Sequence, residues 1–257
     1  MAFTLIAAAA AVALFFGMLG LQEYGYRRGR ARAVRHPESS RHGLGSVEAA
    51  VYGLLGLLIA FSFSGAGTRF ENRRDQIIAE ANALSTAYLR LDVLPAERQP
   101  SLREKFRSYV DARLSIYRKL PDIDAAEAEL ARANALQGEV WKEAVEASLA
   151  GDRTAVLSLL PALNEAFDIA SARTAAAYWH PPIALFGVLM VVALLSSYLV
   201  GDGMSESPTA SRLHMVTYAA VLAIVVYVII DLEFPRFGLI RLTDVDRFLA
   251  ATRDAMR

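Results

Sequence analysis

The sequence predicts an all-α integral membrane protein with four transmembrane helices and a helical-bundle extramembrane domain inserted between the second and third. Two observations support this. The apolar residues are concentrated in four long blocks, and the polar segment between the second and third blocks repeats apolar residues at helical spacing. Hydrophobic residues make up 54% of the 257 residues, more than a soluble domain usually carries. Because this excess is concentrated and not spread over one core, a membrane protein is expected.

The four apolar blocks are the predicted transmembrane segments. Each is close to the roughly 20 residues that cross about 30 Å of hydrocarbon as a helix. In lipid a helix satisfies its own backbone polar groups. Buried helices of a soluble protein are the alternative, but such helices seldom run so far without a charge. The blocks are residues 2–21, 44–67, 182–200 and 213–230.

These blocks divide the chain into four parts. Residues 1–67 carry the first two membrane helices and an Arg-rich connecting loop, and residues 68–180 form the extramembrane bundle. Residues 181–232 carry the last two membrane helices. Residues 233–257 form an amphipathic C-terminal tail that either packs on the bundle or lies on the membrane surface.

Four helices are predicted in the bundle. The first continues straight out of the second span along an apolar stripe and ends at Pro95. Ser101 and Glu104 have the spacing of a capping box that would start the second helix. The third is expected to start at Asp124, and the fourth covers residues 154–180. The tail from Thr243 is expected to form a helix, with Thr243 or Asp244 near its cap and Val245, Phe248, Leu249 and Met256 on its apolar side.

Composition excludes several function classes. The net charge is zero, so no global field points to nucleic acid. The chain has no cysteine, which excludes disulfides, thiol catalysis and cysteine-ligated metal. None of the four histidines has a partner at metal-ligand spacing, and we expect them to be interfacial or solvated. We therefore expect no enzyme, no cofactor, no metal site and no nucleic-acid partner.

A face of small side chains runs along the second span. Small residues let helix backbones approach closely in lipid, so packing is one interpretation of this face. The other is a face turned toward a pore, with Phe61 and Phe63 beside it as a hydrophobic constriction that gates by dewetting. The face consists of Ala49, Gly53, Gly56, Ala60 and Ser64, and continues to Gly67.

Ionisable residues at the ends of the spans are the other candidates. Glu48 falls in the predicted first turn of the second span, where the helix dipole favours an acid, although a charge inside a membrane can also mark an ion path. Asp231 and Glu233 end the fourth span, where the dipole disfavours acids. Arg236 is their expected local partner. A ring of acids at a pore mouth is the alternative if the protein is oligomeric.

Charge also bears on orientation. The arginines near the membrane are equally numerous on the two faces, so a simple tally does not decide. The loop at residues 22–43 is short and rich in arginine, and the positive-inside rule gives such loops the most weight. We therefore expect this loop in the cytoplasm and the domain at residues 68–180 outside it.

Three segments together resemble the bacterial bestrophin-like domain family, a membrane protein family of unknown function. They are Ala60–Phe70 with Arg73 and Arg74, Glu80–Pro95 with Tyr109–Arg113, and Asp231–Ile240. The resemblance implies a multi-pass protein of the bacterial inner membrane. Bestrophins are pentameric anion channels whose second helix lines the pore and whose large helical domain follows that helix in the cytoplasm.

Two functions from different classes follow. The first is a homo-oligomeric, bestrophin-like ion channel or pore, with an anion as the expected ion and the second membrane helix lining the path. Its partners would be the lipid bilayer, further copies of the chain and small inorganic ions. The second is a non-conducting membrane sensor or scaffold whose helical domain binds a ligand or protein partner. The acidic calcium clasp of animal bestrophins is not found in this sequence.

Overall fold

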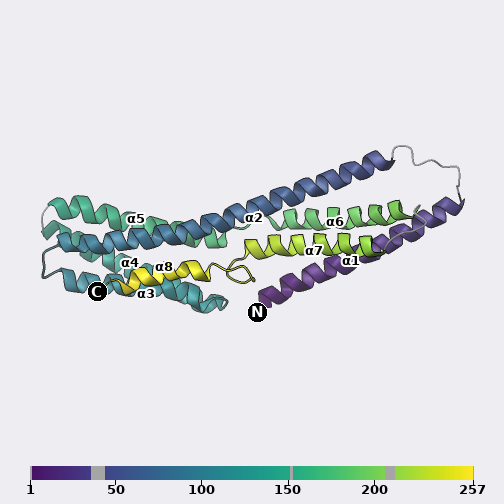
Figure 1. Ribbon diagram of the computed structural model, residues 1–257. Coiled ribbons are helices and arrows are strands. Elements are labelled where there is room, and N and C mark those ends of the chain that lie inside the picture. Colours follow the sequence, from purple (N-terminus) through teal and green to yellow (C-terminus); the bar gives the residue numbers. More distant parts are fainter. Residues whose placement is uncertain (1, 36–43, 151–152, 206–211, 257) are drawn as a thin grey trace. The chain divides into compact units, whose positions relative to one another are not determined.

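The computed structural model describes residues 2–35, 44–150, 153–205 and 212–256, and all of its regular structure is helical (Figure 1). Four of these helices are long and apolar enough to cross a membrane. The predicted all-α membrane fold is therefore confirmed. The helices are α1 (Ala2–Arg35), α2 (Leu44–Leu89), the short 3₁₀-helix η1 (Arg90–Val93), α3 (Gln99–Lys119), α4 (Ile123–Ala150), α5 (Arg153–Tyr178), α6 (Ile183–Met204), α7 (Arg212–Glu233) and α8 (Thr243–Asp254).

The chain forms two compact units, which are described separately. The membrane unit consists of Met1–Arg69 and His180–Ile240, and the helical unit consists of Phe70–Trp179 and Arg241–Arg257. The single helix α2 contributes its first part to the membrane unit and its last part to the helical unit.

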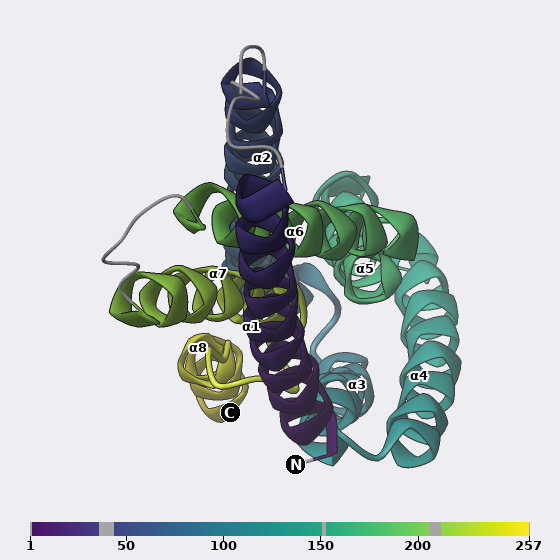
Figure 2. The same cartoon turned by 90° about the vertical axis from the view of Figure 1, so that its right-hand side faces the viewer.

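The membrane unit has its own apolar core. Leu14 and Met18 of α1, Leu55 of α2, Leu189 of α6 and Val226 of α7 are buried together in it. Figures 1 and 2 both show α1 lying beside α6 and α7. Each helix buries one stripe in this core and leaves its remaining surface exposed, as expected for helices surrounded by lipid.

Glycines allow a close crossing of α1 and α6. A Cβ on Gly201 would overlap the carbonyl oxygen of Gln22, and one on Gly25 would overlap the carbonyl oxygen of Tyr198. A Cβ on Gly29 would overlap the side chain of Ser205. Backbone therefore meets backbone at this crossing, which only residues without a side chain permit. This small-residue contact was not predicted from the sequence.

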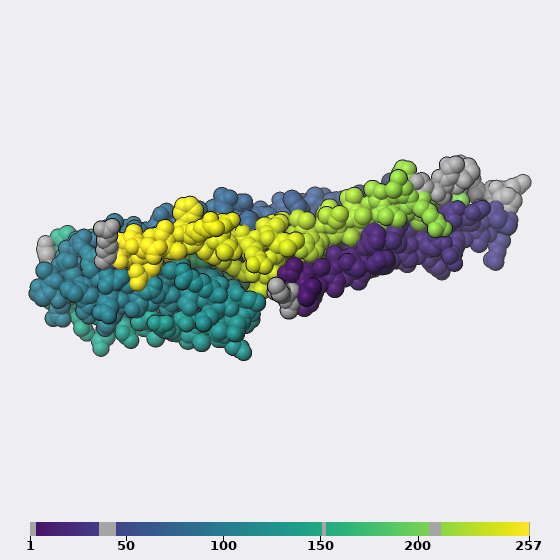
Figure 3. All heavy atoms as spheres, turned by 60° about the horizontal axis from the view of Figure 1, so that its bottom comes forward, coloured from purple at the N-terminus to yellow at the C-terminus, as the bar shows by residue number. Residues whose placement is uncertain are grey.

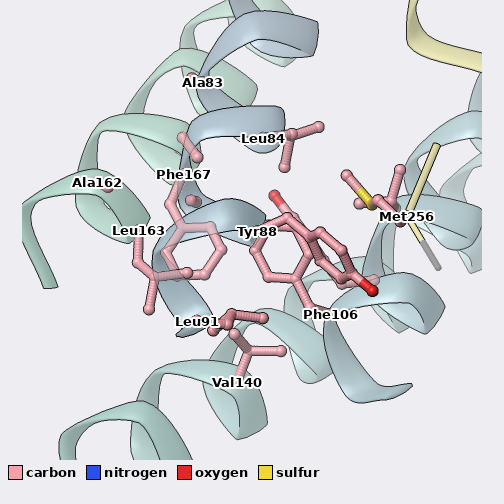
Figure 4. Close-up of a cluster of buried hydrophobic side chains, with 14 of the residues drawn as sticks. Ala83, Leu84, Tyr88, Leu91, Phe106, Val140, Ala162, Leu163, Phe167 and Met256 are labelled. Carbon is pink, nitrogen blue, oxygen red and sulfur yellow. The ribbon is translucent and has the colours of Figure 1, made fainter. Parts of the chain in front are cut away.

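The helical unit has a core of aromatic and aliphatic side chains, and Figure 4 shows part of it. The ring of Phe106 lies 6.0 Å from that of Tyr88, measured between centroids, and 6.1 Å from that of Tyr109. Phe167 makes an edge contact with Tyr109 at 5.3 Å. The apolar stripe predicted to follow the second span is buried in this unit, at Ile77, Ala81, Leu84 and Tyr88 of α2 and at Leu91 of η1.

Two of the predicted helix starts are wrong in detail. Ser101 does not cap α3, because the helix begins at Gln99 with a proline in its first turn, where the fixed φ of proline favours helix. The cap of α4 is Asp122, whose carboxylate accepts the N–H of Ala125 at 3.1 Å, so Asp124 lies inside the helix. The tail helix α8 begins at Thr243, as predicted, and its N-cap, residue 242, makes no side-chain cap bond.

The C-terminal helix α8 packs against α3 in the helical unit (Figure 3). Leu249 and Met256 are buried in the core of this unit. Arg253 Nη2 donates to Asp111 Oδ2 of α3 at 2.8 Å. Phe248 was expected on the buried side but is 59% exposed. Of the two alternatives for the tail, the structure shows packing on the helical bundle.

Candidate functional site

The small-residue face predicted on the second span lies open in the structure. Its five members, Ala49, Gly53, Gly56, Ala60 and Ser64, are all exposed. A Cβ placed on either Gly53 or Gly56 would meet no other atom within 4 Å. Within the part of the chain that the structure describes, nothing packs on this face.

The opposite face of the same helix is the one that packs. Leu55, Ser62 and Ala66 are buried, and Leu55 and Ala66 belong to the core of the membrane unit. Each lies two positions from a member of the open face, which is about 200° around a helix of 3.6 residues per turn. The helix therefore uses one side for its own chain and leaves the small-residue side free.

The exposed sides of α6 and α7 carry mostly larger side chains, although Ala184 and Gly187 of α6 are also exposed. The larger side chains are apolar, which suits contact with lipid tails. Examples are Val191 and Leu195 on α6, and Val221 and Ile224 on α7, each more than half exposed. Glycine, alanine and serine offer little surface to lipid but are enriched where helices pack together. The open face of α2 is therefore a longer continuous row of small residues than the exposed sides of α6 and α7 carry.

The residues beside this face are also exposed or partly so. Phe61 is 69% exposed and Phe63 is 47% exposed, so neither ring is held in the core of its own chain. Glu48 is half-buried and is the fifth residue of α2, one position beyond the first turn in which it was expected. Its carboxylate reaches the neighbourhood of Gly203 at the end of α6.

Glu233 is fully buried and joins three parts of the membrane unit. Its carboxylate lies 2.7 Å from Nε of Arg69, near the end of the membrane part of α2. It also lies 3.1 Å from Nδ1 of His180, just ahead of α6. The imidazole of His180 stacks on Phe234 with ring centroids 4.3 Å apart. Glu233 thus joins the end of α7 to the middle of α2 and to the residue just ahead of α6.

Asp231 organises the loop that follows α7. Its carboxylate accepts the backbone N–H of Leu239 at 2.8 Å and that of Ile240 at 2.7 Å. A Cβ on Gly238 would overlap this carboxylate, so the loop can close around the acid only with glycine at that position. Asp231 is 1% exposed and therefore acts as a buried anchor for the turn.

Sequence reasoning did not find these partners. Arg236 was expected to be the local partner of the two acids, and it lies half-buried in the loop that Asp231 closes. The Arg69 and His180 contacts join residues 164 and 53 positions apart in the chain, which sequence spacing does not reveal. His180 was expected to be interfacial or solvated; its side chain is 31% exposed just ahead of α6, and it contacts the buried Glu233. His214 is exposed, and the other two histidines lie outside the described residues.

The helical unit contains a buried charge network that was also not anticipated. Glu80 of α2 is fully buried and accepts from Nε of Arg113 on α3 at 2.7 Å. Its other oxygen accepts from Nη1 of Arg173 on α5, whose Nη2 reaches Asp246 of α8 at 3.1 Å. The Arg173 guanidinium lies 3.8 Å from the centroid of the Tyr117 ring. Four helices of the unit are joined through these charges.

Each group in this network favours the charged form of its partner. Burial alone would raise the pKa of Glu80, but the adjacent guanidinium groups of Arg113 and Arg173 outweigh it, so the pKa lies below its ordinary value. Burial would likewise lower the pKa of Arg113, and Glu80 reverses this, so that pKa is raised. Glu80 and Arg113 are therefore both charged at neutral pH. The sequence held one signal: Glu80 lies between Ile77 and Leu84 on the buried face of α2, where a charge requires a partner.

The described residues give no indication of metal binding. Among residues 2–35, 44–150, 153–205 and 212–256, no three side chains of the His, Cys, Asp and Glu type come together in a group that could hold an ion. The buried carboxylates instead meet arginine, histidine and backbone N–H groups. The candidate functional site is therefore the open face of α2.

This architecture is similar to that of known proteins. The sequence model of the Bestrophin-like domain family matches residues 26–245. No curated protein matches the chain by sequence.

Solved structures share the fold over nearly the whole chain. A variant of a bacterial Bestrophin homologue from Klebsiella pneumoniae has a TM-score of 0.70 at 15% identity, covering 95% of this chain and 98% of that one. Another structure of a bacterial Bestrophin homologue from Klebsiella pneumoniae, phased with zinc, has a TM-score of 0.63 at 19% identity, covering 93% and 98%. A variant of a membrane protein has a TM-score of 0.70 at 17% identity, covering 93% and 98%.

Proposed function

The chain belongs to the bestrophin-like family, and from this we propose that it is a homo-oligomeric ion channel of the inner membrane whose path is lined by α2. Known bestrophins are oligomeric anion channels, so an anion is the proposed ion. Several copies of the chain would surround the path, because one copy offers only one such helix.

The observation that carries this proposal is the open face of α2. Gly53, Gly56 and Ala60 lie on the exposed side of a membrane helix whose opposite side packs in the core. In the oligomer this face is turned to the path and to the adjacent copy, where small side chains leave room for an ion and its hydration shell. Phe61 and Phe63, exposed beside it, provide the constriction that closes the path by dewetting.

The absence of cysteine from the chain makes a direct test possible. Gly56→Cys and Ala60→Cys each introduce a single thiol on the open face. The matched controls, Val191→Cys and Ile224→Cys, place one on the exposed sides of α6 and α7. The purified protein is reconstituted into liposomes and chloride flux is followed. A charged methanethiosulfonate reagent should block flux through the two α2 variants and leave both controls unchanged.

Two outcomes would contradict the proposal. One is equal block at the α6 or α7 positions, which would place the path elsewhere. The other is the absence of flux from well-folded, oligomeric wild-type protein. That result would favour the second function, a non-conducting sensor or scaffold in which the helical unit binds a ligand or protein partner.

Orientation is proposed from charge and is tested separately. The Arg-rich segment after the first span is placed in the cytoplasm, so the helical unit lies outside it. The known bestrophins have the reverse arrangement. A membrane-impermeant thiol reagent on intact cells decides between them, because Ala96→Cys lies in the helical unit and Ala33→Cys at the end of α1, and both positions are exposed. Labelling of Ala33→Cys alone would overturn the charge argument.

A further inference from the structure

The helix α1 is longer than a membrane span requires. Its 34 residues give a length of about 51 Å, whereas the hydrocarbon core is about 30 Å thick. The predicted span ends near residue 21, and the helix continues without a break to Arg35. This extension carries five arginines and one glutamate, so it projects positive charge from the end of the span.

Tyrosines lie where this extension begins. Tyr24 is 54% exposed, and its ring lies 6.0 Å from that of Tyr198 on α6. Tyr26 follows half a turn later and is half-buried. Tyrosine is enriched at the level of the lipid headgroups, because its ring is apolar and its hydroxyl is polar. These rings therefore mark the headgroup level on α1 and α6.

The arginines that follow reach back toward the same level. Side chains on a helix tilt toward its N-terminus, which for α1 is the direction of the membrane. Arg28 Nη1 donates to the hydroxyl of Tyr24 at 3.3 Å, and Arg30 Nη1 donates to that of Tyr26 at 3.2 Å. The guanidinium groups are thus held beside the tyrosine hydroxyls and not extended into bulk water.

The charges on this surface are only partly compensated. Arg32 pairs with Asp202 of α6 at 2.8 Å, and Arg27 pairs with Glu23 at 2.6 Å while its side chain stays 76% exposed. Arg28 and Arg30 are exposed. Within the described part of the chain, both donate to neutral hydroxyls and neither meets a carboxylate. Two uncompensated cations therefore remain at the headgroup level.

We infer that Arg28 and Arg30, with Arg27 beside them and the hydroxyls of Tyr24 and Tyr26, bind the phosphate groups of anionic phospholipids in the leaflet where α1 leaves the membrane. A guanidinium can hold two phosphate oxygens at once, and a basic segment directly after a span attracts anionic headgroups. The exposed helix surface favours a lipid over free phosphate, because the bilayer itself presents phosphate at this level. The inference does not depend on ion conduction.

The test compares the full chain with variants in detergent by native mass spectrometry. Phosphatidylglycerol and phosphatidylcholine are titrated in turn, and the ratio of their affinities is measured. The double variant Arg28→Gln with Arg30→Gln should lose roughly fivefold of the phosphatidylglycerol preference for each arginine removed. The matched control, Arg118→Gln with Arg247→Gln, changes two exposed arginines of the helical unit and should keep the wild-type ratio.

Single variants and a charge-preserving variant complete the experiment. The single variants are measured as well, in case the double variant does not fold, and each should lose part of the preference. Arg28→Lys with Arg30→Lys keeps both charges and should keep most of it. An unchanged ratio in folded glutamine variants, or an equal loss in the control, would overturn the inference. So would competition by inorganic phosphate beyond that of chloride at matched ionic strength, because the site would then be one for a free anion.

Discussion

Two surfaces of the membrane unit are built from small residues, and their surroundings differ. Where α1 crosses α6, Gly25 and Gly201 bring two backbones together so closely that a methyl group would overlap a carbonyl oxygen. On α2, a methyl group on Gly53 or Gly56 would meet nothing in the same chain. The same residue type thus closes one contact within the chain and leaves another surface open. The spacing of small residues in the sequence indicates only that another helix can come close. The structure shows that the α1–α6 contact is made within one copy of the chain and that, among the described residues, no such contact is made on the open face of α2.

The largest loss of stability is expected at the crossing of α1 and α6. Gly201→Leu forces a side chain into the backbone of α1, so overpacking should reduce stability by about 3 kcal/mol or more. We expect little or no folded protein after purification in detergent, measured by size-exclusion yield and thermal unfolding. A well-folded Gly201→Leu protein would show that the crossing can open, and the contrast with α2 would then lose its basis.

A second change lowers stability without touching either small-residue surface. Glu80→Gln leaves Arg113 and Arg173 without their shared carboxylate, and breaking a buried ion pair in this way costs about 3 to 5 kcal/mol. Chemical unfolding of the helical unit measures it. Chloride flux per folded protein should be unchanged, which separates loss of stability from loss of conduction. Reduced flux from folded protein would argue against that separation.

The pH dependence of the same variant sharpens this test. The folded pKa of Glu80 is lowered, so its stabilising contribution is fully present above the unfolded pKa of about 4.3. That contribution is lost as the pH falls through the lower, folded value. Between neutral and strongly acidic pH, wild type should therefore lose more stability than Glu80→Gln. Parallel acid unfolding curves for the two proteins would contradict the assigned charge state.

A smaller effect is expected beside the crossing. Asp202 pairs with Arg32 at the end of α6, next to Gly29, but the Arg32 side chain is 41% exposed. An ion pair that water reaches contributes about 1 kcal/mol or less. Asp202→Asn should therefore lower the unfolding midpoint only slightly. A loss as large as that of Gly201→Leu would mean that the ion pair, and not the glycine contact, holds α1 to α6.

The smallest effect on stability is expected on the open face of α2. A Cβ at position 53 meets no other atom of the described chain within 4 Å, and leucine is about 1 kcal/mol better than glycine in a helix, so Gly53→Leu should retain the fold. If copies meet at this face, the same change should abolish the oligomer and the chloride flux. Mass photometry and the liposome assay measure both. Intact oligomers with full flux would exclude this face as the shared surface.

The sequence was sufficient for the parts of the fold that local patterns determine. Four apolar blocks predicted the spans, and the stripe from Ile77 to Leu91 predicted that α2 continues beyond the membrane, because lipid thickness and helical periodicity leave few alternatives. Helix starts were less accurate. Pro100 and Asp122 determined the starts of α3 and α4, whereas the prediction had favoured the more familiar capping patterns at Ser101 and Asp124.

Contacts between distant segments were not predictable in the same way. Glu233 was recognised as unusual at the end of α7, but its partners Arg69 and His180 are remote in the sequence. The glycines of the α1–α6 crossing were overlooked because Gly25 and Gly29 stand in the Arg-rich segment that was predicted to be a connecting loop. The open face of α2 was identified from its spacing, and its role in the channel stays a prediction.

The carboxylate of Glu233 has a consequence for how related chains can diverge. Because the buried carboxylate of Glu233 meets the partly exposed Arg69 and His180 at once, replacement of either one removes a partner from a buried charge. Substitutions at these positions should therefore be correlated across the family. An alignment of related chains should show positions 69, 180 and 233 covarying, with an apolar residue at 233 found only where the cation at 69 has also been lost.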